Sequence, residues 1–213
     1  MRKEFQNELS DLNRLLNDMG ELCTNSIRQA AKALETGDLA TAQTIIDSDT
    51  DINEAESNIE NLCLKLLLEQ QPVAKDLRQI SAALKMITDL ERIGDEASDI
   101  AEIITSTHMP PTEFPGITRM SKICMEMVRD SVKAFSDRDL ILARTVQKRD
   151  DEVDDLFEQN RNALLEAAKT GTEISPTKAV DLIMIVKYLE RIADHAVNVG
   201  EWVEFSITGV HNG

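Results

Sequence analysis

The chain has 213 residues, a formal net charge of −16 and 42% hydrophobic residues. That length and hydrophobic content are enough for a packed core, in one large domain or in two of about 100 residues. The negative charge would repel nucleic acid phosphates and anionic lipid, which argues against direct binding to either and favours cations or basic partner surfaces.

The composition also predicts the fold class. Five prolines, eight glycines and 3% aromatic residues, beside abundant Ala, Leu, Ile, Glu, Asp and Lys, indicate long helices rather than strands. We therefore expect an all-α protein.

Apolar residues spaced three and four apart predict three helices in the first half, over 3–35, 39–70 and 73–105. Gly37 is a C-terminal stop for the first helix and Asp38 an N-cap for the second. Pro72 precedes the third helix.

The prolines at 110, 111 and 115 fall together in "THMPPTEFPG", which is typical of a linker. We expect a first domain over 1–107, a linker over 108–115 and a second domain over 116–213.

The second half repeats the pattern, with helices predicted over 117–136, 140–170 and 176–207 and with Asp139 and Ser175 as N-caps. "KALETGDLATAQ" at 32–43 aligns with "KAFSDRDLILAR" at 133–144, which indicates an internal duplication. Three long helices joined by short turns form an up-down-up bundle most simply, so we expect two three-helix bundles in tandem.

The most informative repeat is "LERIGDEASD" at 90–99, which returns as "LERIADHAVN" at 189–198. Residues four apart on a helix lie almost above one another. In all four helices concerned, such a line begins with apolar residues and becomes acidic. The polar steps are Asp49 and Asn53, Glu91 and Asp95, Asp150 and Asp154, and Glu190 and Asp194.

An antiparallel hairpin centred on Pro72 brings Asp49 level with Asp95 and Asn53 level with Glu91. A second hairpin, centred on Thr172, does the same for the four acidic residues of the second half. If the two lines of each hairpin face each other, each half assembles three or four carboxylates.

Two like charges at about 6 Å repel by roughly 3 kcal/mol at an effective dielectric of 20, so such a cluster needs compensation. A multivalent cation supplies it, and oxygen ligands suit Mg, Ca, Mn or Fe rather than a zinc site built from thiolates. The alternative is a solvated, salt-bridged face, with Arg92, Arg191, Lys148 and Arg149 as the neighbouring cations.

Other site chemistries find no support in the residues. A di-iron oxidase would need Glu-x-x-His pairs, and none of the three histidines has an acidic residue three positions before it. We expect His195 to be a packing or surface residue. Cys23, Cys63 and Cys124 lack zinc or disulfide spacing and are expected to be core residues in a reducing compartment. No phosphate loop or nucleophile with its base appears.

The amino terminus lacks an apolar signal region, and no apolar run is long enough to span a membrane, so we expect a cytoplasmic protein. The long amphipathic helices leave a homodimer open.

Over nearly its whole length the chain resembles the PhoU family. The resemblance rests on "ERIGD" and "ERIAD", on "DTDIN" and "RDDEVDD", on "EQQPVAKDLRQI" at 69–80, and on the order and duplication of these motifs. It implies two three-helix bundles related by pseudo-symmetry. It also implies multinuclear clusters of divalent or trivalent metal ions, with Fe, Mn, Mg, Ca and Zn all open.

Carried over residue by residue, the first cluster would use Asp49, Glu91 and Asp95, and the second Asp150, Asp154, Glu190 and Asp194. Asn53 stands where the family pattern often has Asp, which puts the first site's occupancy or metal choice in question. Asp99 and Asn198, the next steps on the same lines, could add ligands.

The resemblance implies a regulator, not an enzyme. It would link the Pst phosphate ABC transporter, through its ATPase subunit, to a PhoR-type sensor histidine kinase, and would restrain phosphate uptake and phosphate-starvation genes. Its association with the membrane would run only through those partners. The alternatives are a metal-storage protein or carboxylate-bridged enzyme, which turnover would reveal, and an inert helical adaptor without metal.

Overall fold

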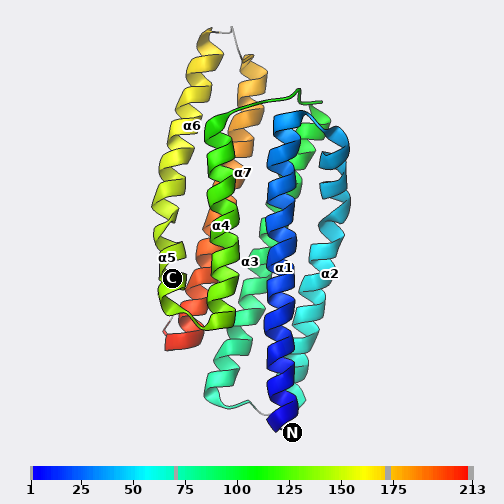
Figure 1. Cartoon of the computed structure of the whole chain (residues 1–213), viewed down its shortest axis with the longest axis vertical. Helices are drawn as coiled ribbons and strands as arrows, with labels where there is room; N and C mark the ends of the chain where they lie inside the picture. The colour runs from blue at the N-terminus through cyan, green and yellow to red at the C-terminus, as the bar shows by residue number, and fades with distance from the viewer. Residues whose placement is uncertain (1, 70–71, 171–173, 211–213) are drawn as a thin grey trace.

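The computed structural model describes residues 2–69, 72–170 and 174–210, and every regular element within these ranges is an α-helix (Figure 1). The predicted all-α class is confirmed. The helices are α1 (Arg2–Thr36), α2 (Leu39–Glu69), α3 (Ala74–Ser106), α4 (Pro115–Asp137), α5 (Leu140–Lys148), α6 (Asp150–Thr170) and α7 (Pro176–Thr208).

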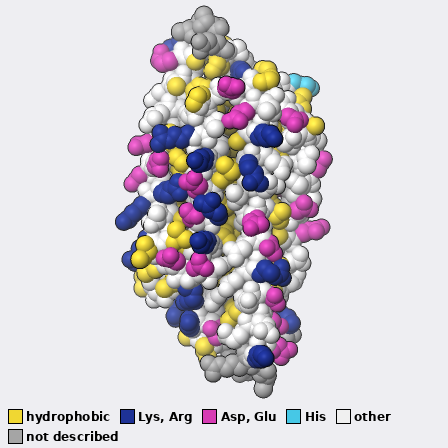
Figure 2. Space-filling view, viewed as in Figure 1, with side chains coloured by type: hydrophobic (Ala, Val, Ile, Leu, Met, Phe, Trp, Pro, Cys, Tyr) yellow, Lys and Arg dark blue, Asp and Glu magenta, His cyan; other side chains and the backbone are white. Residues whose placement is uncertain are grey.

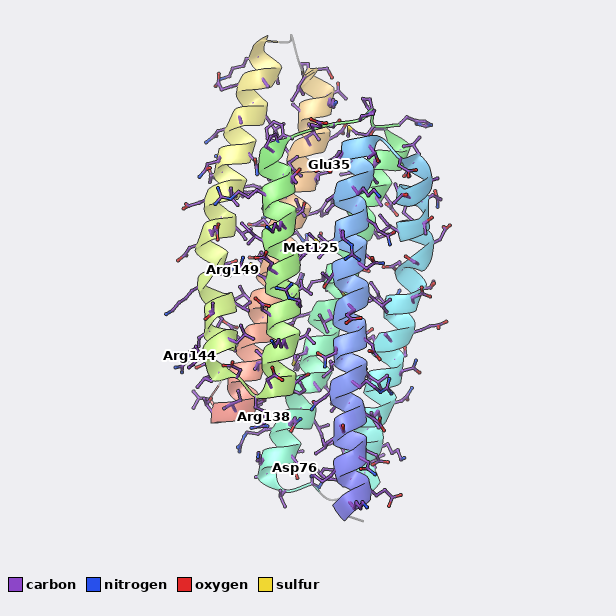
Figure 3. The ribbon with its side chains drawn as sticks, in the orientation of Figure 1. Glu35, Asp76, Met125, Arg138, Arg144 and Arg149 are labelled. Carbon is purple, nitrogen blue, oxygen red and sulfur yellow. The ribbon has the colours of Figure 1, made fainter. Side chains whose placement is uncertain are left out.

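The single helix predicted over 140–170 is wrong, because the chain ends α5 at Lys148 and starts α6 at Asp150. Acidic residues fill the first turn of α6 at 150–152, and the positive end of the helix dipole favours them at a helix start. Arg149, at the junction of the two helices in Figure 3, donates to Glu126 Oε2 on α4 at 2.7 Å. Local charge and this tertiary contact thus both favour a break at 149.

The turns between helices match in the two halves. Gly37 takes a left-handed conformation (φ 67°), and the Asp38 side chain accepts from the backbone N–H groups of Ala40 and Thr41. In the second half Arg138 is left-handed (φ 54°) and the Asp139 side chain accepts from the N–H of Leu142. The predicted N-caps Asp38 and Asp139 are confirmed, as is Ser175, whose Oγ accepts from the N–H of Lys178 at 3.2 Å.

Helices α1, α2 and α3 form one bundle, and α4 to α7 form the other, with α5 and α6 together taking the place of one rod. The bundles lie side by side (Figure 1), and their most extensive mutual contact is between α3 and α7, followed by α1 with α4. The proline-rich stretch crosses one end of the molecule. There the N–H of Thr112 donates to the Leu34 carbonyl at 3.0 Å.

The contact between α3 and α7 is antiparallel and contains polar side chains. Asp89 Oδ1 lies 2.9 Å from His195 Nδ1 and accepts from Asn198 Nδ2 at 3.0 Å. Arg191 forms an ion pair at 2.7 Å with Glu96, whose side chain is only 4% exposed. These groups fix the register of the two bundles, because a shift would leave buried charge without its partner.

The core repeats the duplication down to single hydrogen bonds. The Sγ of Cys23 donates to the Leu90 carbonyl at 3.2 Å, and the Sγ of Cys124 donates to the Leu189 carbonyl at the same distance. All three cysteines are free and buried, and burial raises the pKa of each thiol to about 12. They are core residues, as predicted, and are not available as thiolate ligands near neutral pH.

None of the described helices is both long enough and apolar enough to cross a membrane.

Two candidate carboxylate clusters

The structure brings the acidic lines of α2 and α3 together in the first half. Burial raises the pKa of Asp49, and the negative charge of Asp95 raises it as well. Burial is the largest cause of the raised pKa of Glu91, and the charge of Asp95 is the next. The charges of Glu56 and Asp49 raise the same pKa. Asn53 belongs to the same group, since its Nδ2 donates to Asp49 Oδ2 at 3.1 Å.

Gly94 allows this approach of the two helices. A Cβ at position 94 would lie 2.7 Å from Cδ1 of Ile52 and 3.2 Å from its Cγ2. Gly94 precedes Asp95 on α3, and Ile52 precedes Asn53 on α2. A close contact between the helices therefore lies at the level of the carboxylates. This close approach explains why a glycine stands inside α3.

The second half gathers Asp150 and Asp154 from α6 with Glu190 and Asp194 from α7. Burial, followed by the charges of Asp154 and Asp194, raises the pKa of Asp150 to about 6. Burial also raises the pKa of Asp194, with Glu190 the next cause. All four predicted residues thus interact electrostatically, and we call the two groups the first and second carboxylate clusters.

Arg92 and Arg191 each follow the glutamate of a cluster, and they have different partners in the two halves. In the first cluster Arg92 lies 2.9 Å from Asp95 and 3.5 Å from Glu91, so part of the charge there is balanced, as the salt-bridge alternative expects. Arg191, at the equivalent position, pairs instead with Glu96 of the other bundle. At the second cluster Lys187 pairs with Glu190, and the charges of Lys187 and His195 both lower the pKa of Asp194.

Sequence reasoning missed Glu56. Burial raises the pKa of Glu56, and the charges of Glu60 and Asp95 raise it as well. Glu56 in turn raises the pKa of Glu91. It lies three residues after Asn53 on α2, so the first cluster still has four carboxylates although Asn53 is neutral. The equivalent residue of the second half is Phe157. Glu56 could have been found from its position three residues after Asn53, because residues three apart on a helix are also neighbours. Lines of residues four apart do not include it.

One observation bears directly on whether these residues fit a cation. Asp49 Oδ1 and Asp150 Oδ1 are both buried and have no hydrogen-bond partner. They occupy equivalent positions in the two halves. Leaving a buried charged acceptor unsatisfied costs at least about 1–3 kcal/mol. A bound cation would remove that cost, and carboxylate oxygen is the donor that hard cations prefer. The residues therefore fit a metal ion.

The clusters collect donors without closing a shell around one ion. Among the described residues, no three His, Cys, Asp or Glu side chains already stand in an arrangement that would hold a metal. A shallow polar groove of about 390 Å³ runs along α2 past Asn53 and gives solvent access beside the first cluster. Side-chain rotation or water ligands would have to complete any coordination.

Asp99 and Asn198 make contacts between α3 and α7, although the charge of Asp95 also contributes to the raised pKa of Asp99. Asn198 donates to Asp89, and the Tyr188 hydroxyl hydrogen-bonds to Asp99. His195, expected to be a packing or surface residue, is partly buried against Asp89 in the same contact.

Comparison with known proteins agrees with this architecture. The family model described as "PhoU domain" matches residues 16–104 and 117–203, once in each half. The chain is 36% identical over 211 residues to the phosphate-specific transport system accessory protein PhoU homolog of Clostridium acetobutylicum, covering 98% of this chain and 96% of that one.

Two solved structures are similar along their whole length. The crystal structure of PhoU from Pseudomonas aeruginosa has a TM-score of 0.89 at 32% identity and covers 97% of this chain and 100% of that one. The phosphate transport system regulatory protein PhoU from Streptococcus pneumoniae has a TM-score of 0.90 at 26% identity, with 98% and 99% covered. These relatives are named as accessory or regulatory proteins, not as enzymes.

Proposed function

The chain belongs to the PhoU family, and from this premise we propose that it is a cytoplasmic regulator of phosphate uptake and of the response to phosphate starvation. It acts as a scaffold between the ATPase subunit of the phosphate ABC transporter and a PhoR-type sensor kinase, and it restrains both when phosphate is plentiful. The names of its relatives, which belong to the phosphate-specific transport system, support this assignment.

The proposal includes metal binding by the carboxylate clusters. The observation that carries it is the pair of unsatisfied buried oxygens on Asp49 and Asp150. Glu56, Glu91 and Asp95 would hold metal beside Asp49. Asp154, Glu190 and Asp194 would hold it beside Asp150. Bound metal would supply positive charge that offsets the repulsion within each cluster and links α2 to α3 and α6 to α7.

Metal bound in this way would stiffen the outer helix pairs, and those pairs would then present a fixed surface to a partner. A homodimer is compatible with this role, and contact with the membrane would run through the transporter. Storage or redox chemistry is a weaker alternative, because di-iron centres use histidine ligands, whereas His195, which follows Asp194, directs its Nδ1 to Asp89 of the other bundle.

A variant with Glu190→Ala and Asp194→Ala is expected to lose metal from the second cluster and to bind the transporter ATPase subunit less in a pull-down. The wild type should retain more of that subunit with Mn²⁺ than with EDTA, and the variant should show no such difference. A matched control carries Asp181→Ala and Glu201→Ala, which remove the same charge from α7 outside the cluster, and it should behave as the wild type. Unchanged binding and signalling by the first variant would remove metal from the mechanism.

A further inference from the structure

The outward face of α4 is basic in a chain that is acidic overall. Its exposed charged residues are Arg119, Lys122, Arg129, Lys133 and Asp137, four cations and one anion. The whole chain has 23 Lys and Arg against 39 Asp and Glu. The four cations lie three, seven and four residues apart, so they form one stripe about 21 Å long at a rise of 1.5 Å per residue.

Helix α1 extends this stripe. Asn17 bonds Ser136 at 2.9 Å and Thr118 bonds Glu35 at 2.7 Å, which fixes α1 and α4 as antiparallel neighbours. This register places Lys32 of α1 at the height of Ser121 and Arg28 at the height of Met125, and both cations are exposed. Figure 2 shows dark blue side chains following α4 and reaching the adjacent part of α1. We call these six residues the α1–α4 basic band: Arg28, Lys32, Arg119, Lys122, Arg129 and Lys133.

Acidic neighbours balance only part of this charge. Arg119 pairs with Glu152 at 2.9 Å, and Arg129 with Asp130 at 3.2 Å. The two partly buried acids of α4, Glu126 and Asp130, also face Arg149 of the α5–α6 junction, at 2.7 and 3.9 Å.

Positive charge therefore dominates at the centre of the band. A hydrogen bond from Arg149 lowers the pKa of Glu126, and Lys122 and Arg129 lower it further. No ion pair within the described residues engages Lys32, Lys122 or Lys133. These three lysines remain available to an external anion.

The geometry points to the α1–α4 basic band as the docking surface for an acidic protein, whose carboxylates would meet Lys122, Arg129 and Lys133. Charge complementarity selects the partner: a chain of net charge −16 attracts an acidic protein only through a local basic surface. Met125, half-buried between α4 and α1 in Figure 3, adds apolar surface inside the band, as the centres of protein interfaces have.

A protein fits this band better than an anionic bilayer does. A bilayer presents a broad surface that would also meet the acidic residues around the band, such as Asp18 and Glu21 on α1. A protein partner can confine its carboxylates to the narrow stripe. This inference rests on the proposed function in one respect, because the transporter and the sensor kinase serve as the probes.

The test measures binding of the full chain to the purified phosphate transporter and to the purified sensor kinase of the same organism. A variant with Lys122→Glu and Arg129→Glu is expected to bind one of them at least 10-fold more weakly at 50 mM salt, and high salt should reduce the difference. The control carries Lys75→Glu and Lys85→Glu, two exposed lysines of α3 with the same change of charge. It should bind within about 2-fold of the wild type, because these lysines lie outside the proposed contact.

A carbodiimide that joins lysine to carboxylate directly should give cross-links from Lys122 or Lys133 to Asp or Glu of the partner, detected by mass spectrometry. Equal binding by the wild type and the charge-reversed variant would overturn this inference and leave the proposed function intact. Failure of the wild type to bind either probe would overturn both. Loss of binding to phosphatidylserine vesicles alone would assign the band to lipid and also overturn the inference.

Discussion

Replacing Asp150 with asparagine is expected to weaken Mn²⁺ binding by the second carboxylate cluster about 100-fold or more, since a direct ligand matters at least as much as the groups that orient ligands. The same change should stabilise the metal-free protein at neutral pH, by about 1 kcal/mol after solvent screening is allowed for. Both effects have one cause, which is an ionised carboxylate held among Asp154, Asp194 and buried apolar groups.

The pH dependence follows from the raised pKa of Asp150, which is about 6 in the folded protein against 3.8 for the unperturbed group. A carboxyl group with a raised folded pKa favours the folded state below its unfolded pKa, and that contribution is lost as the pH rises through the folded pKa. In EDTA, this group should therefore make the wild type less stable at pH 7.5 than at pH 5. Metal should reverse the trend, because it binds the ionised form.

Thermal unfolding at both pH values, with EDTA and with Mn²⁺, measures these effects. A matched control is Asp155→Asn, an exposed aspartate on the same helix, which should keep the metal response of the wild type. A variant at Asp150 that binds Mn²⁺ as tightly as the wild type would contradict the role given to this residue.

Gly94→Leu is expected to destabilise the protein by about 3 kcal/mol, because a side chain larger than a methyl group would overpack the contact with Ile52. It should also weaken metal binding at the first cluster, although no carboxylate is removed, since α2 must move away from α3. Chemical denaturation gives the loss of stability, and Mn²⁺ titration gives the loss of affinity.

The duplication supplies a compatible pair of side chains to compare with this variant. At the positions equivalent to Gly94 and Ile52 the second half has Ala193 and Val153, both fully buried. The second half thus has one methyl group more at the glycine position and one fewer at the isoleucine position. The double variant Gly94→Ala with Ile52→Val should therefore stay within about 1 kcal/mol of the wild type. Ser81→Leu, at an exposed site on α3, should have little effect. Full stability of Gly94→Leu would show that the helices do not need this close approach.

The features that were predictable from the sequence are those set by neighbouring residues. Asp38, Asp139 and Ser175 cap helices through their own backbone, so each is visible locally. The internal repeat, together with short turns, was enough to place the acidic lines of each hairpin at one height. The sequence therefore predicts that Asp49 pairs with Asp95, and the structure shows the two interacting.

The features that were not predictable depend on contacts between distant elements. The break at Arg149 is fixed in part by Glu126 on another helix, and periodicity carries no sign of that contact. The equivalent arginines Arg92 and Arg191 have different partners, because only one of them faces the opposite bundle. Metal binding by the clusters stays a prediction, and Asp99 and Asn198 stay predictions as ligands.

The most direct measurement is the anomalous scattering of Mn²⁺ in crystals of the wild-type protein. The account predicts manganese peaks at both clusters, one against Asp49 and one against Asp150, where the unsatisfied carboxylate oxygens lie. Crystals that diffract well at saturating Mn²⁺ and show no peak at either cluster would contradict it.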